Sequence, residues 1–112
     1  MNESQYSIEV PGIGKFTFRG RVSFRDAGRI GGEYYDFCGG IEPPKGSWLD
    51  AVASAYSEMK VLTVAAPDGW NLDTLDPQDQ DSYRKLMEVS SARRAEEARF
   101  RGGSEVGGKA GG

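Results

Sequence analysis

The sequence of 112 residues contains no histidine and a single cysteine. Histidine is the commonest general base in enzymes and the commonest protein ligand of transition metals, so its absence argues against Ser-His or Cys-His catalysis and against most metal centres. Cys38 has no second cysteine with which to form an intramolecular disulfide, which is typical of proteins from a reducing cytoplasm. Because Cys38 directly follows Phe37, we interpret it as a small buried apolar residue rather than as a nucleophile.

Long apolar segments and concentrated basic charge are also missing. No apolar run approaches the roughly 20 residues that cross a bilayer, and residues 1–5 lack the basic and apolar regions of a signal peptide. The formal net charge is −3, whereas nucleic-acid-binding modules concentrate cations on one surface. Arginines are spaced between Arg19 and Arg29, but Asp26, Glu33 and Asp36 offset them. We therefore expect neither a membrane nor a nucleic acid among the partners.

Two short segments near the N-terminus alternate apolar and polar residues with the period of a half-buried strand. They are Tyr6–Val10 and Lys15–Arg19, and Pro11-Gly12 between them favours a type II turn. The pattern predicts a β-hairpin with one apolar face, made of Tyr6, Ile8, Val10, Phe16 and Phe18. Because a two-stranded hairpin is only marginally stable alone, this face must pack on helices.

The segment 24–38 has the start and stop signals of a helix but an unusual interior. Ser23 and Asp26 form the pattern of a capping box, and Gly39-Gly40 supplies a left-handed stop. The expected inner face consists of Phe24, Ala27, Ile30, Tyr34 and Phe37. Glycines within the segment each weaken a helix by about 1 kcal/mol relative to alanine. These glycines, which either allow close approach of a neighbouring backbone or make the segment mobile, are Gly28, Gly31 and Gly32.

A second helix, the best specified of the chain, is predicted to begin after the N-cap residue Ser47. Its apolar face repeats at helical spacing and consists of Trp48, Val52, Ala55, Tyr56, Met59 and Leu62. Pro67 disfavours helical geometry in the residue before it. The helix is therefore expected to end near Ala66.

A third helix is predicted to begin at Asp76-Pro77, with Asp76 as the N-cap and Pro77 as the first helical residue. Its inner stripe consists of Tyr83, Leu86, Met87 and Ser90. After Val89 the stripe fades into alanines among paired charges, a composition that tolerates solvent and buries little surface. Phe100 comes at the end of this helix.

The segment 102–112 is rich in glycine, and Val106 is its one sizeable apolar residue. Such a segment cannot bury enough apolar surface to offset the entropy lost on ordering. We therefore expect a single α+β domain over residues 1–101, in which an N-terminal β-hairpin packs on about three α-helices. A disordered Gly-rich C-terminal tail, residues 102–112, follows it.

Carboxylates between the second and third helices are the strongest candidates for acid–base chemistry. Asp73 and Asp76 are interpreted instead as caps of turns or of a helix. A calcium loop would need a central glycine and a distal glutamate, and neither is in register. Gly14-Lys15 is followed by Phe16 rather than by Ser or Thr, so it does not match a P-loop. We therefore expect no catalytic residue, no metal and no cofactor, and an enzyme that uses carboxylates with an added metal is a disfavoured alternative.

Aromatic and basic residues outside the predicted core carry the functional hypothesis. Trp70 and Leu72 lie in the loop before the third helix, and aromatic anchors are typical hot spots of protein interfaces. Phe100 is flanked by Arg99 and Arg101 at the end of a helix that has lost its apolar stripe. We predict that these five residues bind a partner. The alternatives are that Trp70 closes the core and that Phe100 docks on the body of the domain.

Four segments resemble the tail assembly chaperones of long-tailed, non-contractile bacteriophages. They are IEVPGIGKFTFR (8–19), GIEPP (40–44), KVLTVAAPDGW (60–70) and EEARFR (96–101). The resemblance extends from about residue 5 to Arg101. Its motifs mark turns and helix boundaries rather than a catalytic signature.

The resemblance implies a non-enzymatic assembly factor in the cytoplasm of the infected bacterial host. Such proteins bind the tape measure protein, keep it soluble, help to recruit tail tube subunits and are missing from the mature virion. Self-association and a longer, frameshifted product that continues from the Gly-rich tail are also compatible with this family. The alternative function is that of a small structural phage protein, a head-tail joining or decoration subunit that stays in the virion.

Overall fold

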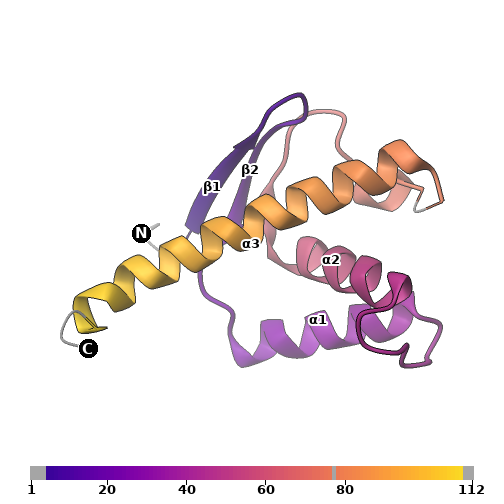
Figure 1. The fold of residues 1–112 in the computed structure, drawn as a ribbon, viewed down its shortest axis with the longest axis horizontal. Helices are drawn as coiled ribbons and strands as arrows, with labels where there is room; N and C mark the ends of the chain where they lie inside the picture. Colours follow the sequence, from indigo (N-terminus) through magenta and orange to yellow (C-terminus); the bar gives the residue numbers. More distant parts are fainter. Residues whose placement is uncertain (1–4, 77, 110–112) are drawn as a thin grey trace.

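The computed structural model describes residues 5–76 and 78–109, with side chains as far as Phe100. A three-stranded antiparallel sheet and three α-helices make up an α+β fold, as the sequence predicts (Figure 1). The elements are β1 (Gln5–Val10), β2 (Gly14–Arg19), α1 (Phe24–Phe37), α2 (Trp48–Leu62), β3 (Thr63–Ala65), the 3₁₀ helix η2 (Leu72–Thr74) and α3 (Gln80–Lys109).

The N-terminal hairpin and its apolar face are confirmed. Tyr6 pairs with Phe18 and Ile8 pairs with Phe16 across the two strands. The turn places Gly12 at φ 83°, a conformation that glycine adopts without strain. Residues of α2 and α3 cover this face, and one core cluster joins the three elements through Tyr6, Val10, Phe16, Phe18, Val52, Ala55, Met59, Leu86 and Val89.

A third strand follows α2 where the sequence predicts that the helix continues toward Ala66. The helix ends at Leu62 instead, and Thr63 pairs with Phe18 while Ala65 pairs with Thr17. The hydroxyl of Thr63 donates a hydrogen bond to the carbonyl of Met59 and so caps the last turn. The prediction of a longer helix is wrong because the open edge of β2 offers strand pairing to the β-branched residues that follow Leu62.

The start and stop signals of α1 are confirmed. The amide of Asp26 donates to Ser23 Oγ at 3.0 Å, and the amide of Ser23 donates to Asp26 Oδ2 at 3.4 Å. At the other end Gly39 has a φ of 71° and Gly40 a φ of 84°. Their amides donate back to Asp36 and Tyr35, in the arrangement of a Schellman motif.

The predicted inner face of α1 is wrong at its N-terminal end. Phe24 is 99% exposed, and Ala27 is exposed as well. Asp26 lies inward instead, because its carboxylate pairs with Arg19 of β2 at 2.8 Å. The N-terminal half of α1 is therefore held by an ion pair, while apolar packing on α2 begins only in its C-terminal half, near Phe37.

The predicted face of α2 is largely confirmed, and the helix is buried on a further side as well. Trp48 is the exception, since 45% of it is exposed, and Tyr56 is half-buried. A second line of buried residues, Ala53, Ser57 and Val61, runs along the helix. This wider burial arises because α2 lies between α1 and α3 (Figure 1).

The predicted start of the third helix is wrong by about one turn. Helix α3 begins at Gln80, and the side chain of Asp79 accepts the amide of Ser82 at 2.9 Å as its N-cap. Asp76 instead accepts the amide of Gln78 at 2.9 Å. Asp76 thus closes a turn before the helix, while Pro77 lies outside the described residues.

The sequence predicts that the apolar stripe of α3 fades after Val89, but α3 remains packed on the domain beyond this residue. Ser90 and Arg93 are buried, and the ring of Phe100 lies 5.4 Å from that of Tyr6. Residues 110–112 and the side chains beyond Phe100 lie outside the described part of the chain. The flexible tail predicted for residues 102–112 therefore stays a prediction.

Arg93 is the largest fully buried side chain among the described residues, with 2% of its surface exposed. Its guanidinium donates to Glu58 at 2.6 Å, to Glu97 at 2.9 Å and to the hydroxyl of Tyr6 at 3.0 Å. Burial acts to lower the pKa of Arg93, but Tyr6, Glu58 and Glu97 outweigh it and raise the pKa above its usual value. One buried cation therefore joins β1, α2 and α3.

Replacing Arg93 with alanine is expected to lower the free energy of unfolding by about 3 kcal/mol, because it breaks a buried ion pair that joins three elements. Urea denaturation measures this loss. Arg94→Ala is the matched control, because Arg94 contacts the same carboxylate of Glu58 but is 48% exposed. Exposed pairs contribute less than about 1 kcal/mol, so equal losses in the two variants would contradict the structural role of Arg93.

Candidate protein-binding site

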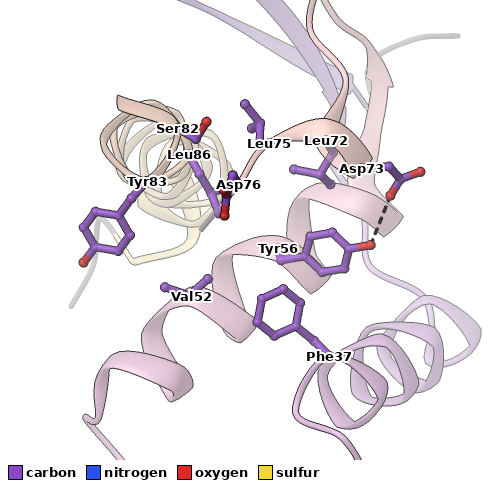
Figure 2. A pocket seen from close by; sticks show the side chains of 10 residues that line it. All are labelled: Phe37, Val52, Tyr56, Leu72, Asp73, Leu75, Asp76, Ser82, Tyr83 and Leu86. Atoms are coloured by element: carbon purple, nitrogen blue, oxygen red, sulfur yellow. Dashed lines mark hydrogen bonds between the residues drawn. The ribbon is translucent and has the colours of Figure 1, made fainter. Parts of the chain in front are cut away.

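An apolar cavity of about 180 Å³ opens between α1, α2, η2 and α3 (Figure 2). We call it the central pocket. Its lining consists of Phe37, Val52, Tyr56, Leu72, Asp73, Leu75, Asp76, Ser82, Tyr83 and Leu86. Figure 2 shows Phe37 and Val52 on one side and Leu72 and Leu75 opposite them.

Local sequence signals position both of these walls. The glycine stop after α1 ends that helix just beyond Phe37, whose ring lies 4.9 Å from that of Tyr56. On the opposite side, the side chain of Asn71 accepts the amide of Asp73 at 3.0 Å and closes a turn. This turn presents Leu72 to the cavity.

A polar chain borders the pocket beside η2. The hydroxyl of Tyr56 donates to Asp73 at 3.2 Å, and the ammonium of Lys60 donates to that hydroxyl at 3.3 Å. Lys60 also lies 3.6 Å from the carboxylate of Asp73. The hydrogen bond to Tyr56 and the nearby carboxylates of Glu33 and Asp73 raise the pKa of Lys60, so this lysine stays charged. On this side of the pocket the carboxylate of Asp73 is therefore paired with a cation of the same chain.

The side of the pocket next to α3 is acidic. Asp76 lines the pocket, and Asp79 follows three residues later at the start of α3. Both accept backbone amides and pair with no cation among the described residues. The nearby cations Arg84 and Lys85 bind Asp81 instead, at 2.9 and 3.2 Å. A partner with a lysine or arginine beside its apolar anchor would meet complementary charge here.

Two aromatic rings extend the apolar surface beyond the pocket. The ring of Trp48 stacks on that of Tyr83 at 6.0 Å, and Tyr83 also lines the pocket. A shallower hollow beside this pair is lined by Trp48, Gln78, Gln80 and Tyr83. An apolar cavity that continues into exposed aromatic residues is the chemistry of a site that takes the apolar side chains of another protein.

The pocket carboxylates are occupied by structural hydrogen bonds. Asp76 caps a turn rather than the third helix. Asp73 accepts the hydroxyl of Tyr56, and the side chain of Asn71 closes the neighbouring turn. Among residues 5–76 and 78–109, no group of three or more His, Cys, Asp or Glu side chains is placed to hold a metal ion.

The residues predicted to bind a partner fall into two separate places. Leu72 lines the central pocket, and it also lines a neighbouring hollow together with Trp70. The ring of Trp70 is half-buried and meets that of Phe16 edge-on at 5.0 Å, so Trp70 partly closes the core. Phe100 packs on Tyr6 near the far end of α3.

The two arginines beside Phe100 differ in what the structure describes. Arg99 is exposed and pairs with Glu96 at 3.0 Å. The side chain of Arg101 lies outside the described residues. Nothing brings Phe100 or Arg99 to the central pocket, so the five predicted residues do not form one site.

Sequence reasoning did not identify Phe37, Trp48 and Tyr83 as site residues. Each has helical spacing typical of a core position, and the sequence analysis places each on an inner face. The sequence feature that these three residues share is a position at a helix end. Phe37 is the last residue of α1, while Trp48 and Tyr83 lie in the first turns of α2 and α3. Aromatic residues at helix ends meet fewer neighbours than aromatic residues in the middle of a packed face, and this leaves them partly open.

No protein-family model, no curated protein sequence and no solved structure matches the chain. Within the described residues, no helix combines the length and apolar content needed to cross a membrane. The functional argument therefore depends on the residues and the geometry of this chain.

A hydrogen bond between α1 and α2 holds the Phe37 wall in place. The hydroxyl of Tyr34 donates to Asp50 at 2.7 Å, and the amide of Gly46 donates to the same carboxylate at 2.8 Å. The Gly46 amide and the Tyr34 hydroxyl hold the pKa of Asp50 below its usual value. The hydrogen bond to Asp50 raises the pKa of Tyr34 from 10.0 to about 12.

These two pKa shifts predict a stability plateau between about pH 4 and pH 10, bounded by the usual pKa values of Asp and Tyr. The pKa of Asp50 is lowered by folding, so its contribution is present above the unfolded-state value and is lost in acid. The pKa of Tyr34 is raised, so its contribution is lost as the pH rises through about 12. Urea midpoints measured from below about pH 4 to above about pH 10 should fall less steeply beyond the alkaline end of the plateau in Tyr34→Phe than in the unaltered protein. A profile parallel to that of the unaltered protein would contradict the role of this hydrogen bond.

Proposed function

We propose that the protein is a non-enzymatic phage tail assembly chaperone that binds the tape measure protein, keeps it soluble and helps to recruit tail tube subunits. The observation that carries the proposal is the central pocket, an apolar cavity continued by half-buried Tyr83 and by the exposed ring of Trp48 stacked on it. The resemblance of the four segments to such chaperones supports the same function.

The geometry of the pocket suits a helical client. A tape measure protein is a long helical chain whose apolar stripes would aggregate before the tail tube encloses them. An amphipathic helix binds by inserting apolar side chains spaced by three or four residues into hollows of its partner. The central pocket would take one such side chain, and the hollow beside Trp48 and Tyr83, which shares Tyr83 with the pocket, would take the next.

The size of the site favours weak and reversible binding. A cavity of about 180 Å³ is smaller than the roughly 300 Å³ at the lower end of small-molecule sites, so one copy covers only a short part of the client. Many copies on one long client gain avidity while each copy remains displaceable. This arrangement suits a factor that acts in the host cytoplasm and leaves before the virion is complete.

Co-expression tests the proposal directly. The protein should keep the tape measure protein of the same phage in the soluble fraction, and Leu72→Ala combined with Trp48→Ala should remove most of this effect. Truncation of a hot-spot residue, a class in which tryptophan is enriched, costs at least about 2 kcal/mol of binding. The measured quantity is the fraction of tape measure protein in the supernatant.

Ile41→Ala is the matched control, because Ile41 is a large exposed apolar residue outside the pocket. Circular dichroism establishes that every variant folds. If the tape measure protein is soluble alone, or if this protein sediments with mature virions, the chaperone proposal is wrong. The second outcome would favour a structural subunit of the head-tail joint or capsid surface.

The acidic side of the pocket gives a separate prediction. Replacing both Asp76 and Asp79 with asparagine removes two negative charges but preserves the caps, because asparagine caps turns and helices as well as aspartate does. We expect slower association with the tape measure protein at low salt and a flatter dependence of the rate on ionic strength. Stopped-flow fluorescence of Trp48 measures the rate. Unchanged rates at low salt would show that the acidic side does not face the client.

A further inference from the structure

The outward surface of α1 carries two exposed aromatic residues. Phe24 is 99% exposed and Tyr35 is 51% exposed. They lie about three turns apart, so they share one face of the helix with Gly28 and Gly31 between them. We call these four residues the outer face of α1. It points away from Ile30 and Phe37, which turn toward the body of the domain.

The glycines leave the middle of this face flat. A Cβ atom built on Gly28 or Gly31 would have no neighbouring atom within 4 Å, so neither glycine is needed to fit the fold. Each glycine nevertheless weakens a solvent-exposed helix. Glycines at such positions allow another helix backbone to approach closely, with the two aromatic side chains at the ends of the contact.

Charges beside the outer face are arranged so that the face complements itself. Arg25 lies near the start of α1 and Asp36 near its end, about three turns apart and on the same flank. Neither has an ion-pair partner among the described residues, whereas Arg29 lies 4.0 Å from Asp26 of its own chain. If the direction of the helix is reversed, Arg25 therefore takes the position of Asp36, and an unpaired cation exchanges places with an unpaired anion.

We infer that the outer face of α1 binds the same face of a second copy, with the two helices antiparallel. In this register Phe24 of each copy meets Tyr35 of the other, and Gly28 meets Gly31. The same register places Arg25 of each copy beside Asp36 of the other. In an antiparallel pair the flank that carries these charges lies on the same side of the interface in both copies. In a parallel pair opposite flanks would meet, so neither Arg25 nor Asp36 would face an opposite charge of the other copy.

The dimer should be weak. Helix α1 has 14 residues and is about 21 Å long, so one helix pair buries well under the roughly 800 Å² per partner of a stable complex. We expect dissociation in the micromolar range or weaker. The interface does not involve the central pocket, so a dimer would present two pockets to a client if the proposed function holds, while dimerisation itself does not depend on that function.

Sedimentation velocity over a concentration series tests the inference on the full chain. Arg25→Asp and Asp36→Arg should each weaken the dimer at least about tenfold, and the double variant that exchanges both charges should restore it. Gly28→Gln should abolish the dimer without loss of helix content, because glutamine is the better helix former. A monomer at every concentration, or failure of the double variant to recover, would overturn the inference.

Cross-linking tests the orientation. A mixture of Phe24→Cys and Tyr35→Cys proteins should form the mixed disulfide, whereas either variant alone should not, since like positions lie far apart in the antiparallel pair. Burial raises the pKa of the Cys38 thiol, which keeps this native cysteine from competing. Cross-linking of either variant with itself would show a different interface.

Discussion

The position of α3 across the sheet depends on a single buried cation. Helix α3 covers the apolar face of the hairpin, and Arg93 fixes it there by joining Glu58 of α2 to Tyr6 of β1. A buried guanidinium is costly unless its donors are satisfied. Both terminal nitrogens of Arg93 have partners while its buried Nε has none among the described residues, so sliding or rotation of the helix would expose further unpaired donors. Tyr83 and Leu86 near the start of the same helix form part of the central pocket. The ion pair between Arg93 and Glu58, which lies outside the pocket, therefore helps to set the position of the pocket wall that α3 forms.

The pocket itself arises from the way three helices meet. Helix α1 packs on α2 and ends just after Phe37, η2 approaches from the loop, and α3 begins one turn later than its sequence suggests. Three elements that end or begin near one point cannot fill the space between them as densely as continuous helices do. The central pocket and the outer face of α1 lie on different sides of α1. The two surfaces can therefore act independently.

Several local features were predictable because their causes are local. The alternation in Tyr6–Val10 predicts a strand, and the capping box at Ser23 and the glycines after Cys38 predict both ends of α1. Strand β3 was not predictable from Thr63–Ala65, because its pairing depends on the edge of β2. Of the predicted site residues whose side chains the structure describes, only Leu72 lines the central pocket, since burial of Trp70 and Phe100 is decided by partners distant in the sequence, Phe16 and Tyr6.

By itself the sequence determined the α+β class, the hairpin with its apolar face and the helix caps, because hydrogen bonds and side-chain alternation over a few residues decide these features. Tertiary structure decided which side of α1 faces inward, since the ion pair from Asp26 to Arg19 outweighs the apolar pattern that begins at Phe24. It also decided the burial of Arg93, a residue whose neighbours along the chain are charges and alanines. A charged side chain enters a core only where distant partners supply compensating hydrogen bonds, and those partners come together only in the folded chain.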